Sequence, residues 1–176
     1  MDVPATAFGP GSLCPFTCYF EGDSHVRARS IDDIVDWLRG CEYVSDLEQF
    51  HECDRWQAPC AFEQSRRGDC EDFALWAWRK LAEIGVDAEF YVGRMECDDE
   101  PDRDRQHAWV VYRAGLEAFL FEPAAGTADA MIRRLSDVQD DYVPHFAVNR
   151  RFKTSAFVGC ILDSDRVRRR TAGTSG

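Results

Sequence analysis

The amino-acid sequence predicts an α+β protein, because its hydrophobic period changes near the middle of the chain. Apolar residues recur at helical spacing over residues 70–84 and then alternate with polar residues beyond Gly85. Two further apolar runs, 108–112 and 118–121, flank Ala114-Gly115, an arrangement typical of an antiparallel hairpin. We therefore expect a helix that packs on an antiparallel sheet.

The chain has 176 residues, 45% of them hydrophobic, which suits a single domain with its own core. Residues 1–28 contain Pro, Gly and scattered aromatics without a period, and we expect them to form an arm over the domain. The domain is expected to span residues 29–163. Residues 164–176 are basic and then small and polar, which predicts a disordered tail.

Before the central helix, Ser30-Ile31-Asp32-Asp33 has the form of a capping box, so a first helix is expected from there to about Gly40. Residues 41–67 show no period and predict irregular structure.

After the hairpin, a short helix is expected from about residue 128 to 135. Two strands are expected near residues 142–148 and 152–161, and Pro144 suggests that the first of them lies at an edge.

The charge excludes some partners. The chain carries 32 Asp and Glu against 21 Lys and Arg, a formal net charge of -11, which repels phosphate backbones and anionic lipid. No run approaches the ~18 apolar residues of a membrane span. The N-terminus shows no basic region followed by an apolar one, so no signal peptide is expected. These observations predict a cytoplasmic protein that binds neither nucleic acid nor membrane.

The eight cysteines are expected to be free thiols in that compartment, and one of them to be reactive. A zinc site is the alternative, although the paired short spacings of zinc ribbons and fingers are missing. Its ligands would come from Cys14, Cys18, Cys41, His51, Cys53 and Cys60. The acidic stretch over residues 98–104 is interrupted by arginines and predicts a solvated loop rather than a calcium loop.

Cys70 is the candidate nucleophile, because it lies in the first turn of the central helix. Asp69 is a good N-cap, and Asp72 stands where a carboxylate can reach back to the amide of the cap. Free backbone N–H groups and the helix dipole favour a thiolate there. The carboxylates of Asp69, Glu71 and Asp72 oppose it, so a thiolate would need a cation beside it.

The hairpin supplies a partner. His107 lies seven residues before Ala114, and Glu122 lies seven residues after Gly115. A turn centred between Ala114 and Gly115 would place His107 opposite Glu122, with Cβ atoms about 5 Å apart. The carboxylate would then orient the imidazole as the base for the Cys70 thiol.

These motifs resemble the transglutaminase-like branch of the papain-like cysteine hydrolases, and most of all the bacterial transglutaminase-like cysteine proteinases. The segments that carry the resemblance are Trp56-Gln57-Ala58-Pro59, Gly68-Asp69-Cys70-Glu71-Asp72-Phe73-Ala74, His107-Ala108-Trp109 and Phe121-Glu122-Pro123. It implies a papain-like fold, in which Cys70 is the nucleophile, His107 the base and Glu122 the third member. The family usually has Asp at the last place, so we expect Glu122→Asp to retain or improve activity.

An oxyanion hole is also required, because negative charge develops on the carbonyl oxygen during attack. The backbone N–H of Cys70 is one natural donor. For the second donor, the resemblance ranks the Trp56 indole first and Gln64 next, and Gln57 is third.

The sequence thus predicts a hydrolase or acyltransferase that acts on an amide or isopeptide bond of a protein or peptide, with no metal or organic cofactor. Transfer of the acyl group to water or to an amine remains open. The alternatives are an inactive binding or scaffold module of the same fold and a metal-stabilised interaction domain.

Overall fold

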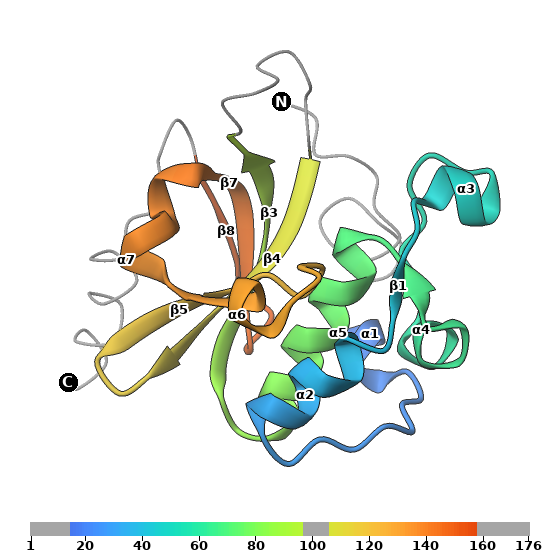
Figure 1. The fold of residues 1–176 in the computed structure, drawn as a ribbon, viewed down its shortest axis with the longest axis horizontal. Coiled ribbons are helices and arrows are strands. Elements are labelled where there is room, and N and C mark those ends of the chain that lie inside the picture. The colour runs from blue at the N-terminus through green and yellow to red at the C-terminus, as the bar shows by residue number, and fades with distance from the viewer. Residues whose placement is uncertain (1–14, 97–105, 158–176) are drawn as a thin grey trace.

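The structure is a computed structural model that describes residues 15–96 and 106–157. It has two main layers, with most helices on one face of an antiparallel sheet, as Figure 1 shows. The α+β class and the helix-on-sheet arrangement predicted from the sequence are confirmed. Within the described residues, no helix is both long enough and apolar enough to span a membrane.

Six strands form the main sheet, in the order β6-β5-β4-β3-β7-β8, with every neighbouring pair antiparallel. Their bounds are β3 (Asp87–Met95), β4 (Gln106–Ala114), β5 (Glu117–Phe121), β6 (Ile132–Arg134), β7 (Tyr142–Asn149) and β8 (Thr154–Ala156). A separate parallel pair consists of β1 (Glu42–Tyr43) and β2 (Arg67–Gly68). The strands β3 and β4 therefore lie at the centre of the main sheet.

The helices include the two that the sequence predicts most clearly. Their bounds are α1 (Phe16–Glu21), α2 (Ile31–Leu38), α3 (Asp46–Phe50), α4 (Pro59–Ser65), α5 (Cys70–Glu83), α6 (Ala128–Met131), α7 (Leu135–Val138) and the 3-10 helix η1 (Gln139–Asp141). The capping box of Ser30 and Asp33 is present at the start of α2. The central helix, α5, begins at the cysteine as predicted.

The main core lies between α5 and one face of the sheet. Side chains of α5 such as Trp76 and Trp78 are fully buried there with Phe90 of β3. Phe16 and Tyr19 of α1 belong to the same core, so this part of the expected arm is built into the domain. The opposite face of the sheet holds a second core beneath α7.

Three segments differ from the sequence prediction. The segment expected to be irregular, residues 41–67, contains β1, α3, α4 and the first residue of β2, and these elements are too short for a hydrophobic period to show. The helix expected over residues 128–135 is divided into α6, β6 and the first residue of α7, because Ile132–Arg134 pair with β5.

The third difference concerns Pro144, whose strand β7 is not an edge strand, since it lies between β3 and β8. Pro144 pairs with Gly93, and the register shifts between Val92 and Gly93, where β7 contains one extra residue. A bulge of this kind is a second place where a sheet tolerates proline. The strand expected over 152–161 is β8, and residues 158–161 lie outside the described residues. So do the expected tail over 164–176, the first 14 residues of the arm and the acidic loop over 98–104.

Candidate active site

The cysteine at the start of α5 has different neighbours from those expected. Asp69 is the N-cap residue, but its side chain makes no capping hydrogen bond. Asp72 does not reach back to the cap either. Its carboxylate accepts hydrogen bonds from the backbone N–H of Gln57 at 2.7 Å and from the Gln57 side-chain amide at 2.5 Å. Asp72 therefore joins the start of α5 to the segment before α4.

His107 and Glu122 are in contact, as predicted. His107 Nε2 lies 2.6 Å from Glu122 Oε2, and both side chains are largely buried. The register that led to this prediction is wrong by two residues, because Ala114 pairs with Glu117 and the turn is Gly115-Leu116. Gly115 has a φ of 63°, which the primed turns of two-residue hairpins require. Glu122 follows the last paired residue of β5 and reaches His107 diagonally.

Cys70 and His107 line one cavity of about 320 Å³. Trp56 and Tyr43 are also in its wall. A second cavity, of about 470 Å³, shares His107 and Tyr43 with the first and adds Glu122 and Tyr142. The structure therefore brings the nucleophile and the base of the predicted triad to one cavity.

The Cys70 thiol is held in its protonated form. Burial raises its pKa well above the usual value, and the charge of Glu71, a hydrogen bond to Glu71 and the charge of Asp69 raise it further. The Sγ atom donates to Glu71 Oε2 at 3.0 Å, and within the described residues no hydrogen bond joins it to His107. The thiolate expected from the sequence is thus not favoured, because Cys70 is only 8% exposed. The sequence does not reveal this burial.

The four candidate oxyanion donors have different surroundings. Cys70 is the first residue of α5, so the helix does not need its backbone N–H. The Trp56 indole borders the cavity, but it donates to Asp54 Oδ1 at 2.7 Å. The Gln57 amide is bound to Asp72 and to the Arg67 carbonyl. Gln64 is exposed on α4 and is not among the described residues that line the cavity.

Tyr43 was not among the predicted site residues, although it lines both cavities. Its side chain is half exposed. Burial raises the pKa of its hydroxyl above the usual value, and the nearby charge of Asp69 raises this pKa further. The hydroxyl therefore remains a donor at neutral pH. Tyr43 belongs to the segment 41–67, which shows no period, so the sequence does not mark it as a site residue.

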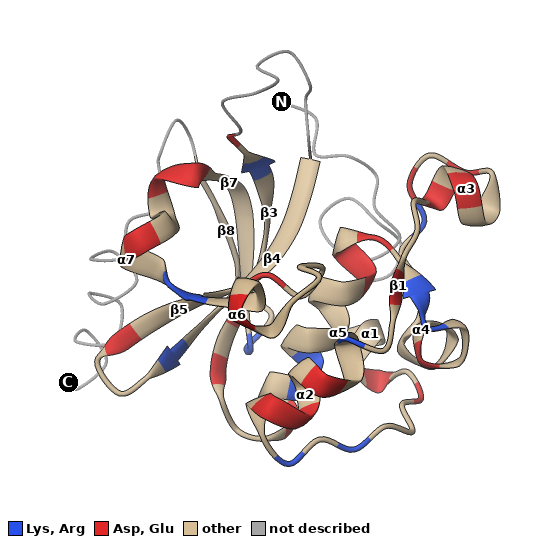
Figure 2. Ribbon diagram, viewed as in Figure 1, with Lys and Arg blue, Asp and Glu red and all other residues tan. Residues whose placement is uncertain are grey.

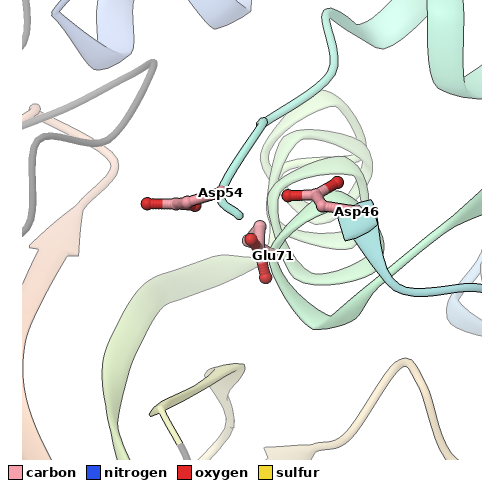
Figure 3. Close-up of side chains that lie close together, drawn as sticks. All are labelled: Asp46, Asp54 and Glu71. Carbon is pink, nitrogen blue, oxygen red and sulfur yellow. The ribbon is translucent and has the colours of Figure 1, made fainter. Parts of the chain in front are cut away.

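Three carboxylates meet beside Cys70, from α3, the following loop and α5. Asp46, Asp54 and Glu71 offer oxygens that lie within 4.8 Å of one another, as Figure 3 shows. Two oxygens that each lie about 2.4 Å from Ca²⁺ are at most about 5 Å apart, so this spacing fits a calcium ion.

Asp46 provides the test of that fit. It is 3% exposed, and one of its oxygens accepts from the backbone N–H of Arg55. The other oxygen, Oδ1, is buried and has no hydrogen-bond partner among the described residues. A buried acceptor without a donor suits a cation ligand. The sequence does not reveal this set, since its members lie up to 25 residues apart and two of them, Asp46 and Asp54, lie in a segment without a period.

The zinc alternative does not gain support. Among the described residues, the groups that could hold a metal consist of carboxylates only, and Cys18, Cys41, Cys53 and Cys60 are free thiols.

Comparisons with known proteins identify the fold. No family model and no curated protein matches the sequence. Among solved structures, EGTA-treated LapG from Legionella pneumophila superposes with a TM-score of 0.55 at 17% identity, over 91% of this chain and 78% of LapG. The calcium-bound form of LapG gives a TM-score of 0.52 at 17% identity, over 90% of this chain and 82% of LapG. The chain therefore has the papain-like α+β fold that it shares with LapG.

Proposed function

We propose that this protein is a cysteine hydrolase or acyltransferase that attacks an amide bond in a protein or peptide. Cys70 is the nucleophile, His107 the base, and Glu122 the acid that orients the imidazole. The observation that carries the proposal is the 2.6 Å contact of Glu122 with His107, whose imidazole lines one cavity together with Cys70. The fold shared with LapG supports it.

The hydrogen bond between Glu122 and His107 Nε2 leaves Nδ1 to take the Cys70 proton. The sulfur then attacks the carbonyl carbon, and the carbonyl oxygen carries the negative charge. When this intermediate collapses, the carbon–nitrogen bond breaks and the imidazolium gives its proton to the leaving amine. A thioester on Cys70 remains. Water, or an amine, attacks the thioester and releases the acid or the new amide.

We also propose that calcium binds beside the nucleophile. Asp46, Asp54 and Glu71 would hold it, because carboxylate oxygens are its usual ligands and one LapG structure is calcium-bound. The charge of the ion would offset the negative charge that surrounds the thiol. Without such compensation, the Cys70 thiol donates its hydrogen bond to Glu71 and not to His107.

The contact between Cys70 and Glu71 also favours a second candidate, an inactive binding or scaffold module. A buried thiol that donates to a carboxylate is a poor nucleophile, and a module without turnover could keep this arrangement. The two candidates differ in whether Cys70 can be acylated.

The test is acylation by an activated ester, followed by mass spectrometry of the intact protein in the presence of calcium. One acyl group should appear on Cys70 and be absent from Cys70→Ala. His107→Ala should slow its formation by about 10² or more, since general-base catalysis supplies this much. Cys60→Ala and His145→Ala, neither of which lines either cavity, are the matched controls and should behave as wild type. Acylation of Cys53 instead, or an unchanged rate in His107→Ala, would support the scaffold module.

Calcium binding is tested separately from activity. Titration calorimetry with CaCl2 should show one site, and the melting temperature should fall after EGTA treatment. Asp46→Asn should abolish both effects, whereas Asp36→Asn, at an exposed position of α2, should preserve them. Equal binding by wild type and Asp46→Asn, or no heat with wild type, would overturn the assignment.

A further inference from the structure

A row of four hydrogen-bonded side chains crosses the sheet behind the candidate base. Arg133 of β6 lies 2.9 Å from the Tyr142 hydroxyl of β7, and that hydroxyl lies 3.2 Å from Glu122 Oε2. The same carboxylate oxygen lies 2.6 Å from His107 Nε2. The members of the row come from β4, β6, β7 and the end of β5, so only the folded sheet brings them together.

The chemistry of the first member sets the direction of every hydrogen bond in the row. A guanidinium has only donors, so the Tyr142 oxygen must accept from Arg133. The single hydroxyl proton of Tyr142 then points to Glu122. A carboxylate that receives this bond is an acceptor, and its Oε2 therefore also accepts from His107 Nε2–H. His107 keeps its proton on Nε2, and Nδ1 is left as the unprotonated nitrogen.

Burial shields the hydrogen bonds of this row from water. Tyr142 is 1% exposed, and Glu122 is also buried. Burial and the charge of Glu122 raise the pKa of the Tyr142 hydroxyl above the usual range, so it stays protonated and able to donate. The Trp109 ring lies 5.0 Å from the Tyr142 ring and is stacked on the His107 ring at 6.1 Å, which limits rotation of both.

We propose that Arg133 and Tyr142 are positioning residues that hold Glu122 as an acceptor and His107 in its Nε2–H tautomer. The consequence for acylation rests on the proposed function, because it requires Nδ1 to receive the Cys70 proton. The tautomer itself does not depend on activity. A purely structural role, in which Arg133 ties β6 to β7, would leave the tautomer unchanged when the row is interrupted.

The experiment reads the His107 tautomer from two-bond proton–nitrogen correlations of the imidazole rings in ¹⁵N-labelled full-length protein. The four histidines are His25, His51, His107 and His145, and a His107→Gln sample identifies the His107 signal. Wild type should show His107 mainly as the Nε2–H form. Tyr142→Phe and Arg133→Met should give a mixture of both tautomers, and Arg133→Lys should restore the wild-type spectrum because lysine also only donates.

Arg134→Met is the matched control, since Arg134 is the next residue, is exposed and pairs with Glu117 instead. It should leave the spectrum unchanged. In acylation assays, Tyr142→Phe should be slower by on the order of 10, a smaller loss than the ~10⁴ that follows removal of the orienting carboxylate in serine enzymes.

The outcomes separate the two proposals. A wild-type His107 spectrum in both Tyr142→Phe and Arg133→Met overturns the positioning role, even if Cys70 is acylated normally. A changed His107 tautomer in these variants supports the positioning role, whether or not Cys70 is acylated. If wild type is not acylated either, only the proposed function fails.

Discussion

The carboxylate of Glu122 has two partners, because one oxygen serves both His107 and Tyr142. Sequence reasoning suggests that Glu122→Asp would retain or improve activity, but the structure leads to the opposite expectation. Removal of one methylene withdraws the carboxylate by about 1.5 Å, which lengthens both hydrogen bonds beyond their normal range.

We predict that Glu122→Asp lowers the rate of Cys70 acylation by about tenfold and that Glu122→Gln lowers it by 10 to about 10³. Gln keeps the length of the side chain but removes the charge that stabilises the imidazolium. The measurement is the acylation rate with an activated ester, with melting temperature to confirm folding. Glu117→Gln, at an exposed position of β5, is the control and should be neutral. A wild-type rate in Glu122→Gln would mean that Glu122 does not orient His107.

The sequence predicts the three triad residues because Cys70 begins a helix and because His107 and Glu122 flank a hairpin at equal distances from its expected turn. It does not predict Asp46, Asp54 or Tyr142 as site residues. These are placed by the packing of distant segments, and no local pattern records that packing. The protonation of Cys70 is a similar case, since burial decides it and the helix start alone does not.

At the scale of elements, Gly93 of β3 lies where three strands approach closely. It pairs with His107 of β4 on one side and with Pro144 of β7 on the other. A Cβ atom at this position would lie 2.7 Å from Pro144 Cα and 2.8 Å from the Trp109 ring, which is too close for either contact. Glycine here therefore lets the strands that carry His107 and Tyr142 pack together.

We predict that Gly93→Ala destabilises the protein by about 1–3 kcal/mol, the usual cost of overpacking, and also slows acylation, because β7 or Trp109 must move. Chemical denaturation and the activated-ester assay measure the two effects. Gly126→Ala is the matched control, since a Cβ atom there meets nothing within 4 Å. Equal stability of the Gly93 variant and wild type would contradict the close approach.

Long elements with a clear period are predicted well by the sequence, as α2, α5 and the β4–β5 hairpin show. The predicted hairpin register differs from the observed one by two residues, because the turn is Gly115-Leu116 and not Ala114-Gly115. The hydrophobic pattern alone does not distinguish these two turns. Short elements such as β1 and α3 were missed, since two to five residues cannot display a period.

At the scale of the molecule, the charge is strongly negative and acidic residues are spread over several helices, among them α2, α3 and α7, as Figure 2 shows. Two basic residues are nevertheless buried on α5. Lys80 is fully buried and bonds to Ser24, the Val26 carbonyl and Glu83, while Arg79 donates to the Tyr19 and Gly22 carbonyls. The segment after α1 is therefore fastened to the central helix.

Glu63 completes this fastening from α4. It accepts hydrogen bonds from the Ser24 hydroxyl at 2.5 Å, the His25 backbone N–H at 2.6 Å and the Trp76 indole at 2.9 Å. Burial raises its pKa, but these hydrogen bonds outweigh burial and lower the pKa below the ordinary value. Because the folded-state pKa is lowered, the carboxylate contributes stability above its unfolded pKa of about 4.3 and loses it as the pH falls through the folded pKa.

We predict that Glu63→Gln lowers the free energy of unfolding by about 2–4 kcal/mol at pH 7, because the buried ammonium of Lys80, which lies 3.5 Å from Glu63 Oε1, loses a charged partner. The difference from wild type should shrink as the pH is lowered from about 5 toward 3. Denaturation curves at several pH values measure it, with Glu21→Gln at an exposed position of α1 as the control. A difference that stays constant over this range would show that the charge of Glu63 is not responsible.

The position of β7 has a consequence for the order in which the site is completed during synthesis. A ribosome delivers Cys70, His107 and Glu122 before it delivers Tyr142, and β3 remains an unpaired edge until β7 arrives beside it. A nascent chain that already contains the whole triad therefore lacks the strand that carries the Tyr142 hydroxyl to Glu122. On our assignment, full reactivity therefore requires that the C-terminal strands have left the ribosome, and a chain that ends before β7 should be acylated more slowly than the finished protein.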